Sequence, residues 1–280
     1  MRFASLNSGS NGNCYYVSNE QSAVLIDAGL SCRETERRLL RLGLDIQSIK
    51  AIFISHEHND HITGSIALAK KYNLPLYLTQ GTKRHLNLPV DSVTHHVIQQ
   101  HEVRKAGSLT VISFPKSHDA AEPVSFVVSD GQTHVGVFTD IGHCCNHVTH
   151  YFRQCHALFL ESNYCDQMLE EGPYSATLKK RIRGKKGHLS NDQALELFTT
   201  HRPPQLSHLI LSHLSQQNNT HKKVEDLFAP HAGPTHIEIA SRYKETAVFE
   251  VEASGPGIRL LSPPSPETGN RQLLLFGDQD

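Results

Sequence analysis

The segment that decides the fold is Ala51-Ile52-Phe53-Ile54-Ser55-His56-Glu57-His58-Asn59-Asp60-His61, in which an apolar run leads into four potential metal ligands. The apolar run predicts a buried strand, so the polar residues fall in the loop that leaves it. His56 and His58 project together because alternate residues share a side, while Asp60 and His61, one turn later, can face a neighbouring ion. Imidazole and carboxylate ligands suit zinc, iron or manganese. The segment therefore predicts a pair of metal ions, and a polar surface loop is the alternative.

Composition limits the class of protein. The chain has 280 residues, enough for one or two domains with a sizeable core. It carries 27 Lys and Arg against 28 Asp and Glu, which excludes a uniformly basic protein. No apolar run approaches the roughly 20 residues of a membrane helix, and the first residues lack the apolar core of a signal peptide. We therefore expect a cytoplasmic protein with no membrane partner.

Cysteine and histidine usage adds to this picture. The six cysteines form no C-x-x-C pair, so we expect free thiols in a reducing compartment. Twenty histidines stand beside two methionines and no tryptophan. His143 and His147 flank Cys144-Cys145 and raise the hypothesis of another metal site, with an ordinary structural role as the alternative. Other histidines are expected at the surface: His85, His95, His96, His101 and His236.

Short strands alternate with helices along most of the chain. Strands are predicted at 24–27, 51–54, 76–79, 109–114, 124–129, 134–139, 157–161 and 208–212. Helices are predicted after a capping box at Ser31, over 62–72, and over 194–200 after a second capping box at Ser190. Adjacent groups of strands with helices between them predict a sheet packed on a sheet with helices outside.

The composition changes after Glu252. Ten of the eighteen residues from 253 to 270 are Ser, Pro or Gly, so the stretch 253–271 is predicted to be a flexible linker. A tail over 272–280 follows it.

The hexapeptide 56–61 resembles the signature of the metallo-β-lactamase superfamily, and the later positions of that superfamily occur in order. His118 lies in Pro115-Lys116-Ser117-His118-Asp119, Asp140 in Phe138-Thr139-Asp140-Ile141-Gly142, and His213 in Leu211-Ser212-His213-Leu214. The resemblance covers about residues 1–250. It implies an α+β fold, the four-layer αββα sandwich, forming one catalytic domain over 1–252.

The resemblance also implies a ligand set for two divalent transition-metal ions, zinc, manganese or iron. One ion is held by three histidines: His56, His58 and His118. The other ion is held by Asp60, His61 and His213, and Asp140 bridges the two. Asp27, at the end of an early strand, matches the superfamily position whose side chain does not bind metal but orients a residue that does.

A second element separates branches of the superfamily. The sequence Gly187-His188-Leu189-Ser190-Asn191 resembles a His-Ser element of the phosphodiesterase members, notably the tRNA 3′-processing nucleases. That resemblance implies that His188 serves the phosphate and the leaving oxygen. Because Ser190 opens a helix, Ser190 and Asn191 are predicted to help bind a phosphate.

A basic run lies just before this element. It comprises Lys179, Lys180, Arg181, Arg183, Lys185 and Lys186. Beside a dinuclear site such a run favours binding of a nucleic-acid backbone, and a solvated helix face is the alternative.

The compact arrangement most resembles the YycJ/WalJ family, whose members are regarded as metal-dependent 5′→3′ DNA exonucleases. Only 47 residues separate Asp140 from His188, so the β-CASP cap of other nucleases is absent. The His-Glu element of the tRNA-processing enzymes appears as Leu160-Glu161-Ser162-Asn163, with the acid kept and the His lost. The opening stretch 5–13 also fits the family; its glycines would let N–H groups approach a phosphate, or form an ordinary turn.

We therefore expect a metal-dependent phosphodiesterase acting on DNA, with RNA as an alternative substrate. The resemblance implies a hydroxide bridged by two metals that attacks phosphorus in line. Asp60 would orient this nucleophile, and His188 would protonate the leaving oxygen. The alternatives are a thiolesterase of the glyoxalase II type, a small-molecule or cyclic-phosphate phosphodiesterase on the same metals, and a non-enzymatic metal-binding or clamp-docking module.

The tail contains one further motif. Gln272-Leu273-Leu274-Leu275-Phe276 resembles the pentapeptide Gln-Leu-x-Leu-Phe that binds the bacterial sliding clamp. Leu273, Leu275 and Phe276 would fill an apolar pocket, and Gln272 would supply hydrogen bonds. A peptide tethered by a flexible linker suits recruitment during DNA replication or repair. The alternative is an apolar tail that docks on its own domain.

Overall fold

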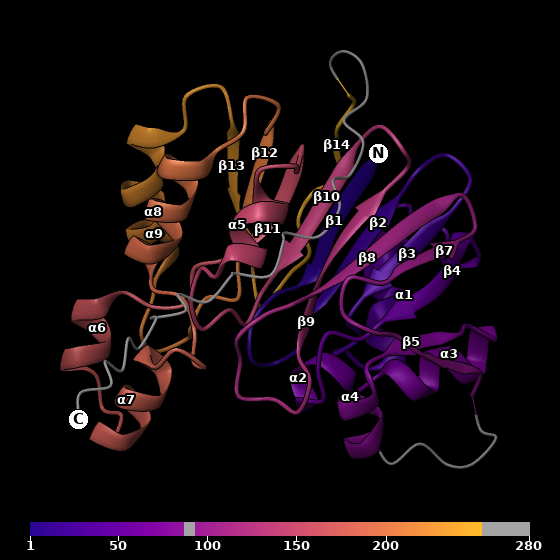
Figure 1. Cartoon of the computed structure of the whole chain (residues 1–280), viewed down its shortest axis with the longest axis horizontal. Helices are drawn as coiled ribbons and strands as arrows, with labels where there is room; N and C mark the ends of the chain where they lie inside the picture. Colours follow the sequence, from indigo (N-terminus) through magenta and orange to yellow (C-terminus); the bar gives the residue numbers. More distant parts are fainter. Residues whose placement is uncertain (87–92, 254–280) are drawn as a thin grey trace, which may run out of the picture.

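The computed structural model describes residues 1–86 and 93–253, which form two seven-stranded sheets packed face to face (Figure 1). The first sheet has the order β14-β1-β2-β3-β4-β5-β6. Its strands are β1 (Arg2–Asn7), β2 (Cys14–Ser18), β3 (Ala23–Ile26), β4 (Ile49–Phe53), β5 (Leu76–Leu78), β6 (His95–Val97) and β14 (Phe249–Glu250). The first 100 residues thus build this sheet, and one late strand completes its edge.

The second sheet has the order β13-β12-β11-β10-β9-β8-β7. Its strands are β7 (Val103–Ala106), β8 (Leu109–Pro115), β9 (Val124–Ser129), β10 (His134–Phe138), β11 (Ala157–Glu161), β12 (His208–Ser212) and β13 (His236–Ile239). The strands β7 to β10 are joined as antiparallel hairpins, whereas β10 to β13 are parallel with helices between them.

Helices cover the outer faces of both sheets (Figure 1). The α-helices are α1 (Cys32–Arg41), α2 (Asn59–Ile62), α3 (Ser65–Tyr72), α4 (Gln80–His85), α5 (Asn146–Phe152), α6 (Asp166–Glu171), α7 (Ala176–Arg183), α8 (Asn191–His201) and α9 (His221–Phe228). Two 3₁₀ turns are η1 (Ile46–Ser48) and η2 (Ala229–His231). None of the helices over 1–86 and 93–253 is long and apolar enough to cross a bilayer.

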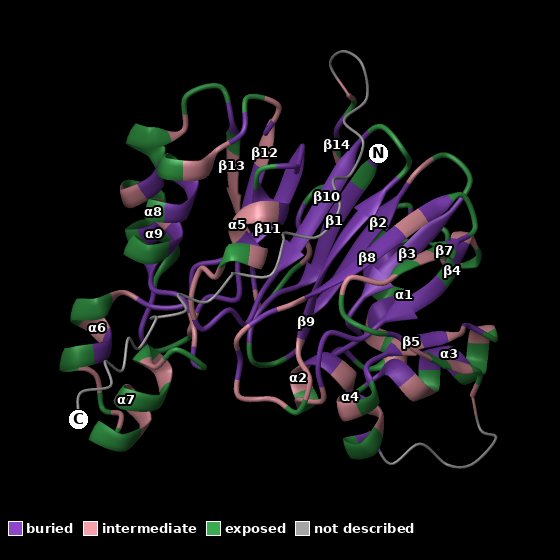
Figure 2. Cartoon of the chain, in the orientation of Figure 1, coloured by how far each residue is buried: buried purple, intermediate pink, exposed green. Residues whose placement is uncertain are grey.

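Three apolar cores separate four layers. Val24 and Phe159 belong to the core between the sheets, Leu25 to the core beneath α1 and α3, and Leu158 to the core beneath α5, α8 and α9. Neighbouring strand residues therefore enter different cores, because side chains alternate across a strand. The sheets are buried while the helices keep exposed outer faces (Figure 2). The predicted αββα sandwich is confirmed.

The predicted strands and helices are all present, with changes at their ends. The helix predicted over 62–72 is α3, which starts at Ser65, and residues 59–62 form the separate short helix α2. Thr79 caps α4 rather than ending β5. The strands β1, β2, β6, β7, β13 and β14 were not predicted. Nearly all of the predicted linker and the whole tail, with the clamp-like peptide 272–276, lie outside the described residues.

The sheet topology brings the predicted site residues to one edge. The strands β3 and β4 are parallel, and β8, β10, β11 and β12 also share one direction, because β8 and β10 both run antiparallel to β9. Each strand ends just before or at a polar residue of interest: Asp27, His56, His118, Asp140, Glu161 and His213. The carboxyl ends of the two sheets therefore supply opposite walls of one site.

Candidate metal centre

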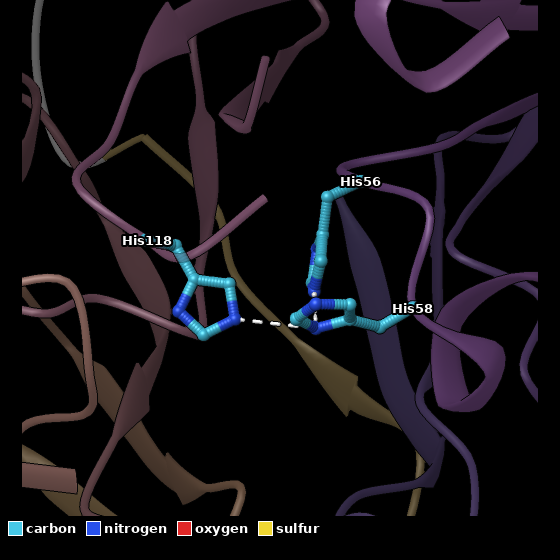
Figure 3. A group of neighbouring side chains, drawn as sticks. All are labelled: His56, His58 and His118. Atoms are coloured by element: carbon cyan, nitrogen blue, oxygen red, sulfur yellow. Dashed lines mark hydrogen bonds between the residues drawn. The ribbon is translucent and has the colours of Figure 1, made fainter. Parts of the chain in front are cut away.

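The first group of ligands is formed by three histidines whose ring nitrogens converge. The Nε2 of His56 lies 3.0 Å from the Nδ1 of His58, which lies 3.4 Å from the Nε2 of His118. Figure 3 shows the ring of His118, which follows β8 of the second sheet, directed toward the other two rings. A tetrahedral zinc ion with bonds of about 2.0–2.1 Å holds its ligands about 3.3 Å apart. The spacing of these nitrogens fits such an ion.

The second group of ligands gathers on the other side of Asp140. The Nε2 atoms of His61 and His213 each lie 3.5 Å from Asp60 Oδ2. Asp140 Oδ2 is 3.1 Å from His61 Nε2, and Asp140 Oδ1 is 3.5 Å from His213 Nε2 and 3.8 Å from His118 Nε2. Asp140 thus lies between the two groups. The structure brings together all seven residues predicted as metal ligands.

Hydrogen bonds behind the rings fix which nitrogen faces the centre. His61 Nδ1 donates to Asp27 Oδ2 at 2.7 Å, and His118 Nδ1 donates to the carbonyl of Gly187 at 3.1 Å. His213 Nδ1 lies 3.3 Å from Glu161 Oε1. Because carboxylates and carbonyls only accept, Nδ1 carries the proton in each ring and Nε2 offers its lone pair to the centre. This is the arrangement that orients histidine ligands in metal proteins.

Asp27 organises the loop that carries the hexapeptide. Its two oxygens accept hydrogen bonds from the backbone N–H and the hydroxyl of Ser55, at 2.8 and 2.9 Å. Gly29 lets this loop pack closely, because a Cβ there would lie 1.7 Å from the carbonyl oxygen of Asp60. Asp27 is fully buried and bonds to His61 Nδ1, on the side of the ring that faces away from the centre.

Three of these residues have left-handed backbone conformations. Asp27, Asp140 and His213 have φ angles of 60°, 54° and 58°, each just after a strand. This conformation is uncommon for residues other than glycine and costs of order 1–3 kcal/mol each. The chain turns sharply there, and the strain is concentrated at residues that meet in one site.

The centre carries an excess of buried negative charge. Burial alone would raise the pKa of the Asp140 carboxyl, but His213 and His61 lower it well below its usual range. Burial alone would lower the pKa of His213, but Asp140, Asp60 and Glu161 raise it to about 10. Burial alone would also lower the pKa of His61, but the negative charges of Asp27, Asp140 and Asp60 raise it well above its usual range. The carboxylates thus favour positive charge at both rings, which is the charge that a bound cation would supply.

The other two buried rings favour the neutral form. Burial lowers the pKa of His118 to about 4, and it lowers that of His56 well below the usual range. Metal ions bind neutral imidazole and ionised carboxylate. Asp140 Oδ2 is buried without a hydrogen bond of good geometry. The donor set, its charge and this oxygen fit a site for divalent metal ions.

His188 lies beside this centre and is held by Glu161. Its Nδ1 is 2.7 Å from Glu161 Oε1, and its ring stacks on that of His213 with the ring centres 5.4 Å apart. Burial alone would raise the pKa of Glu161, but His188 and His213 lower it to about 2. The ionised carboxylate therefore accepts the Nδ1 proton, and Nε2 is the nitrogen of His188 that remains for chemistry.

Ser190 and Asn191 lie near His188 but are engaged inside the protein. Ser190 accepts a hydrogen bond from the N–H of Gln193 in a capping box, and Asn191 bonds to Ser162 and Asn219. Both residues are buried. The prediction that they bind phosphate does not fit this arrangement, because their polar groups already have protein partners.

The basic run divides into paired and exposed residues. Arg181 forms an ion pair of 2.5 Å with Asp119, the neighbour of His118, and Arg183 pairs with Glu170 at 2.6 Å. Lys179 donates to a backbone carbonyl of α6. Other lysines of the run are exposed: Lys180, Lys185 and Lys186.

Three residues of the site, Asn13, Glu161 and Asn163, were not predicted from the sequence to have a role. Asn13 Nδ2 lies 3.1 Å from both Asp60 Oδ2 and His61 Nε2. Asn163 Nδ2 donates to the His213 carbonyl at 2.7 Å, and Glu161 joins His188 to His213. Glu161 could have been identified from the sequence, because it ends a predicted strand and lies in the segment 160–163, which aligns with the His-Glu element of the tRNA-processing enzymes. Asn13 and Asn163 could not have been identified in this way, because asparagines are common in loops.

The glycine-containing loop near the N-terminus is engaged within itself. The N–H of Gly9 donates to Asn13 Oδ1, and that of Gly12 donates to the carbonyl of Gly9, both at 2.9 Å. Their N–H groups are therefore occupied by the loop, which instead places Asn13 against the centre.

The hypothesis of another metal site at 143–147 finds no support among the described residues. The ring of His143 bonds to the carbonyl of Lys185, and that of His147 packs on His101. No group of potential ligands found over 1–86 and 93–253 includes these residues or Cys144 and Cys145. His85, His96 and His236 are exposed as predicted, whereas His95 and His101 are half-buried.

The fold and the centre together define a metal-dependent hydrolase of the metallo-β-lactamase superfamily, and residues 22–214 match the β-lactamase superfamily domain. The chain is 34% identical over 224 residues to Exodeoxyribonuclease YycJ of Bacillus anthracis, covering 78% of this chain and 84% of that protein. It is 30% identical over 223 residues to Exodeoxyribonuclease WalJ of Streptococcus pneumoniae strain D39, covering 78% and 83%. The chain belongs to the YycJ/WalJ family.

A solved structure agrees in fold. The metallo-β-lactamase fold protein YhfI of Bacillus subtilis superposes with a TM-score of 0.66 at 17% identity, covering 88% of this chain and 98% of that one. At this identity the likeness concerns the fold alone.

Proposed function

We propose that this protein is a metal-dependent 5′→3′ DNA exonuclease. The observation that carries the proposal is the convergence of seven ligand residues around Asp140, with the Glu161–His188 pair beside them. The exodeoxyribonuclease names of the relatives at 34% and 30% identity support the choice of DNA and of cleavage from an end. A metal centre next to a histidine with a fixed tautomer is suited to phosphodiester hydrolysis.

The proposal assigns the ligands as the spacing suggests. His56, His58 and His118 would hold one divalent transition-metal ion, Asp60, His61 and His213 would hold another, and Asp140 would contribute to both. When bound, such ions activate water near neutral pH and neutralise charge on the phosphoryl oxygens. Zinc, manganese and iron all suit these ligands.

Other residues of the site orient the nucleophile, protonate the leaving oxygen or attract the DNA. Asp60 is held by Asn13 at 3.1 Å and has an oxygen directed at the centre, where it orients the attacking nucleophile. His188, with Nδ1 fixed by Glu161, protonates the leaving oxygen from Nε2. Arg181 and the exposed Lys185 and Lys186 attract the phosphate backbone to this edge.

The direct test incubates metal-loaded protein with single- and double-stranded DNA and RNA labelled at either end. Stepwise shortening of DNA from the 5′ end supports the proposal. Shortening of RNA alone, or cleavage from the 3′ end alone, would contradict the assigned substrate or polarity. Hydrolysis of thioesters with intact DNA would instead favour the thiolesterase.

The variant His188→Ala tests the assigned proton donor. We expect it to lose at least 100-fold in the rate of DNA cleavage, because general acid catalysis contributes that much. It should retain its metal content, measured by plasma mass spectrometry, because His188 is not among the assigned ligands. Normal cleavage by this variant would show that His188 has another role.

The same proposal places the enzyme in the cytoplasm, where its six free cysteines stay reduced. Recruitment by the sliding clamp during replication or repair remains a prediction from the sequence of residues 272–276. Deleting 272–280 should abolish binding to a purified bacterial clamp and leave hydrolysis of short oligonucleotides unchanged.

A further inference from the structure

A small pocket adjoins the metal centre and has no role in the chemistry described above. It has a volume of about 200 Å³, and His188 and His213 form its inner wall. Its outer wall is formed by Tyr174, Leu178 and Ile182. Whatever occupies the pocket therefore lies in contact with the residues that face the reacting phosphate.

The outer wall is apolar and comes from one segment of chain. Tyr174 lies in the connection between α6 and α7, and Leu178 and Ile182 lie four residues apart on α7, on one face of that helix. All three residues are half-buried, and no residue of α7 is fully buried. The helix thus uses its apolar side chains to line the pocket rather than to fill a core.

Specific contacts hold α7 over the site. Arg181 pairs with Asp119 at 2.5 Å, next to His118, and the N–H of His188 donates to the carbonyl of Ile182 at 2.9 Å. Gly187 permits this approach, because a Cβ there would lie 2.1 Å from the same carbonyl oxygen. The pocket is therefore a fixed feature whose wall is tied to the residues around the centre.

Several polar groups of the pocket are already engaged within the protein. Asn163 donates its amide to the His213 carbonyl at 2.7 Å, and the hydroxyl of Ser215 accepts from the N–H of Asn218 at 3.2 Å. Arg181 is paired with Asp119. The pocket therefore offers an aromatic ring and apolar contact more than free hydrogen-bonding groups.

We propose that this pocket binds the unpaired base of the terminal nucleotide, stacked on Tyr174, so that the enzyme removes one nucleotide at a time from a single-stranded end. The inference rests on the proposed function. An apolar wall with one aromatic ring suits a base of any sequence, because every base has a π-face. The volume of about 200 Å³ is below the roughly 300–1,000 Å³ of pockets for drug-sized ligands, which suits a single base better than a base pair.

Two properties of the reaction follow. A paired terminus must be opened before its base enters the pocket, so blunt duplex ends react more slowly than single strands. The preference among the four bases is weak, because their edges meet few free polar groups.

The test compares single-stranded oligonucleotides with an ordinary or an abasic terminal nucleotide, labelled at the far end. Stacking of one base on an aromatic side chain is worth about 5- to 150-fold in binding. We expect kcat/KM for removal of the terminal residue to fall by such a factor when the base is absent. Equal kcat/KM for the two substrates would overturn the inference, and this comparison requires no variant.

Variants then assign the effect to Tyr174. Tyr174→Leu should bring the ratio of the two kcat/KM values close to one, whereas Tyr174→Phe, which keeps the ring, should preserve most of it. Leu40→Ala, at an exposed position on α1, is the surface control and should leave the ratio unchanged. Melting temperatures show whether each variant is folded. A ratio unaffected by Tyr174→Leu would show that the base binds elsewhere.

A substrate without a base separates this inference from the proposed function. If the wild-type protein with manganese hydrolyses bis(p-nitrophenyl) phosphate and DNA but ignores the terminal base, the pocket assignment is wrong and the proposed function stands. If it hydrolyses neither this diester nor DNA, the proposed function and the inference both fail.

Discussion

Replacing Glu161 with glutamine tests whether this carboxylate sets the tautomer of His188. Glu161 is fully buried and accepts from four donors. Oε2 accepts from the N–H groups of Ile141 and Leu189, at 2.6 and 3.2 Å. Oε1 faces the Nδ1 atoms of His188 and His213, at 2.7 and 3.3 Å.

The amide of glutamine has a single acceptor oxygen, so it can serve only one of these two pairs. If the oxygen faces the backbone, the amide N–H₂ meets His188 Nδ1 and forces the proton of that ring to Nε2. If it faces the histidines, two buried backbone N–H groups lose their acceptor. Each hydrogen bond to a charged group is worth about 1.5–3 kcal/mol, so loss of two of them in Glu161→Gln should lower the free energy of unfolding by about 3–6 kcal/mol. The catalytic rate should fall by about 10²–10⁴-fold, because His188 is then presented in the wrong tautomer.

The assay is single-turnover cleavage of a labelled single strand at saturating metal. Weaker metal binding, of about 10–100-fold, is expected because Glu161 also orients His213, and excess metal removes that contribution. Glu196→Gln, at an exposed position on α8, is the matched control and should behave as the wild type. A Glu161→Gln variant that cleaves at the wild-type rate would refute the tautomer argument.

Three other perturbations have defined outcomes. Asp140→Asn, which tolerates the left-handed backbone, should reduce bound metal below two ions per chain by mass spectrometry; undiminished metal content would remove Asp140 from between the ions. Lys185→Ala with Lys186→Ala should weaken binding of all DNA sequences alike and reduce the slope of log K against log salt by about 1.4; an unchanged slope would show that these lysines lie off the path of the DNA. Burial lowers the pKa of His156 to about 4 from about 6.5 in the unfolded chain, so the unfolded state binds more protons between these values and stability falls as pH drops through this window. Urea unfolding of the metal-free protein should show that the non-titrating variant His156→Asn loses about 2 kcal/mol less than the wild type between pH 7 and 5, and equal losses would contradict this.

The sequence was most informative where chemistry is local. The ligands of the hexapeptide lie within six residues after a strand, so the period of the backbone places them together before any tertiary contact is known. His118, Asp140 and His213 were predicted from the resemblance to the superfamily, whose later positions occur in order after predicted strands, and the structure brings these strand ends to a common edge. The phosphate-binding role predicted for Ser190 does not fit its surroundings, for the complementary reason. Its capping role was visible in the sequence, but its burial depends on packing against distant segments.

By itself, then, the sequence determined the fold class, and its resemblance to the superfamily supplied the predicted metal ligands and the predicted role of His188, because residue types at strand ends and short motifs can be compared without a structure. Only the tertiary structure decided which nitrogen each ring presents, how Glu161 holds His188, and that Tyr174 faces the centre across a small pocket. Those features depend on pairs of atoms that lie far apart in the chain, such as Asp27 with His61 and Asp119 with Arg181, and only folding brings them within hydrogen-bonding distance.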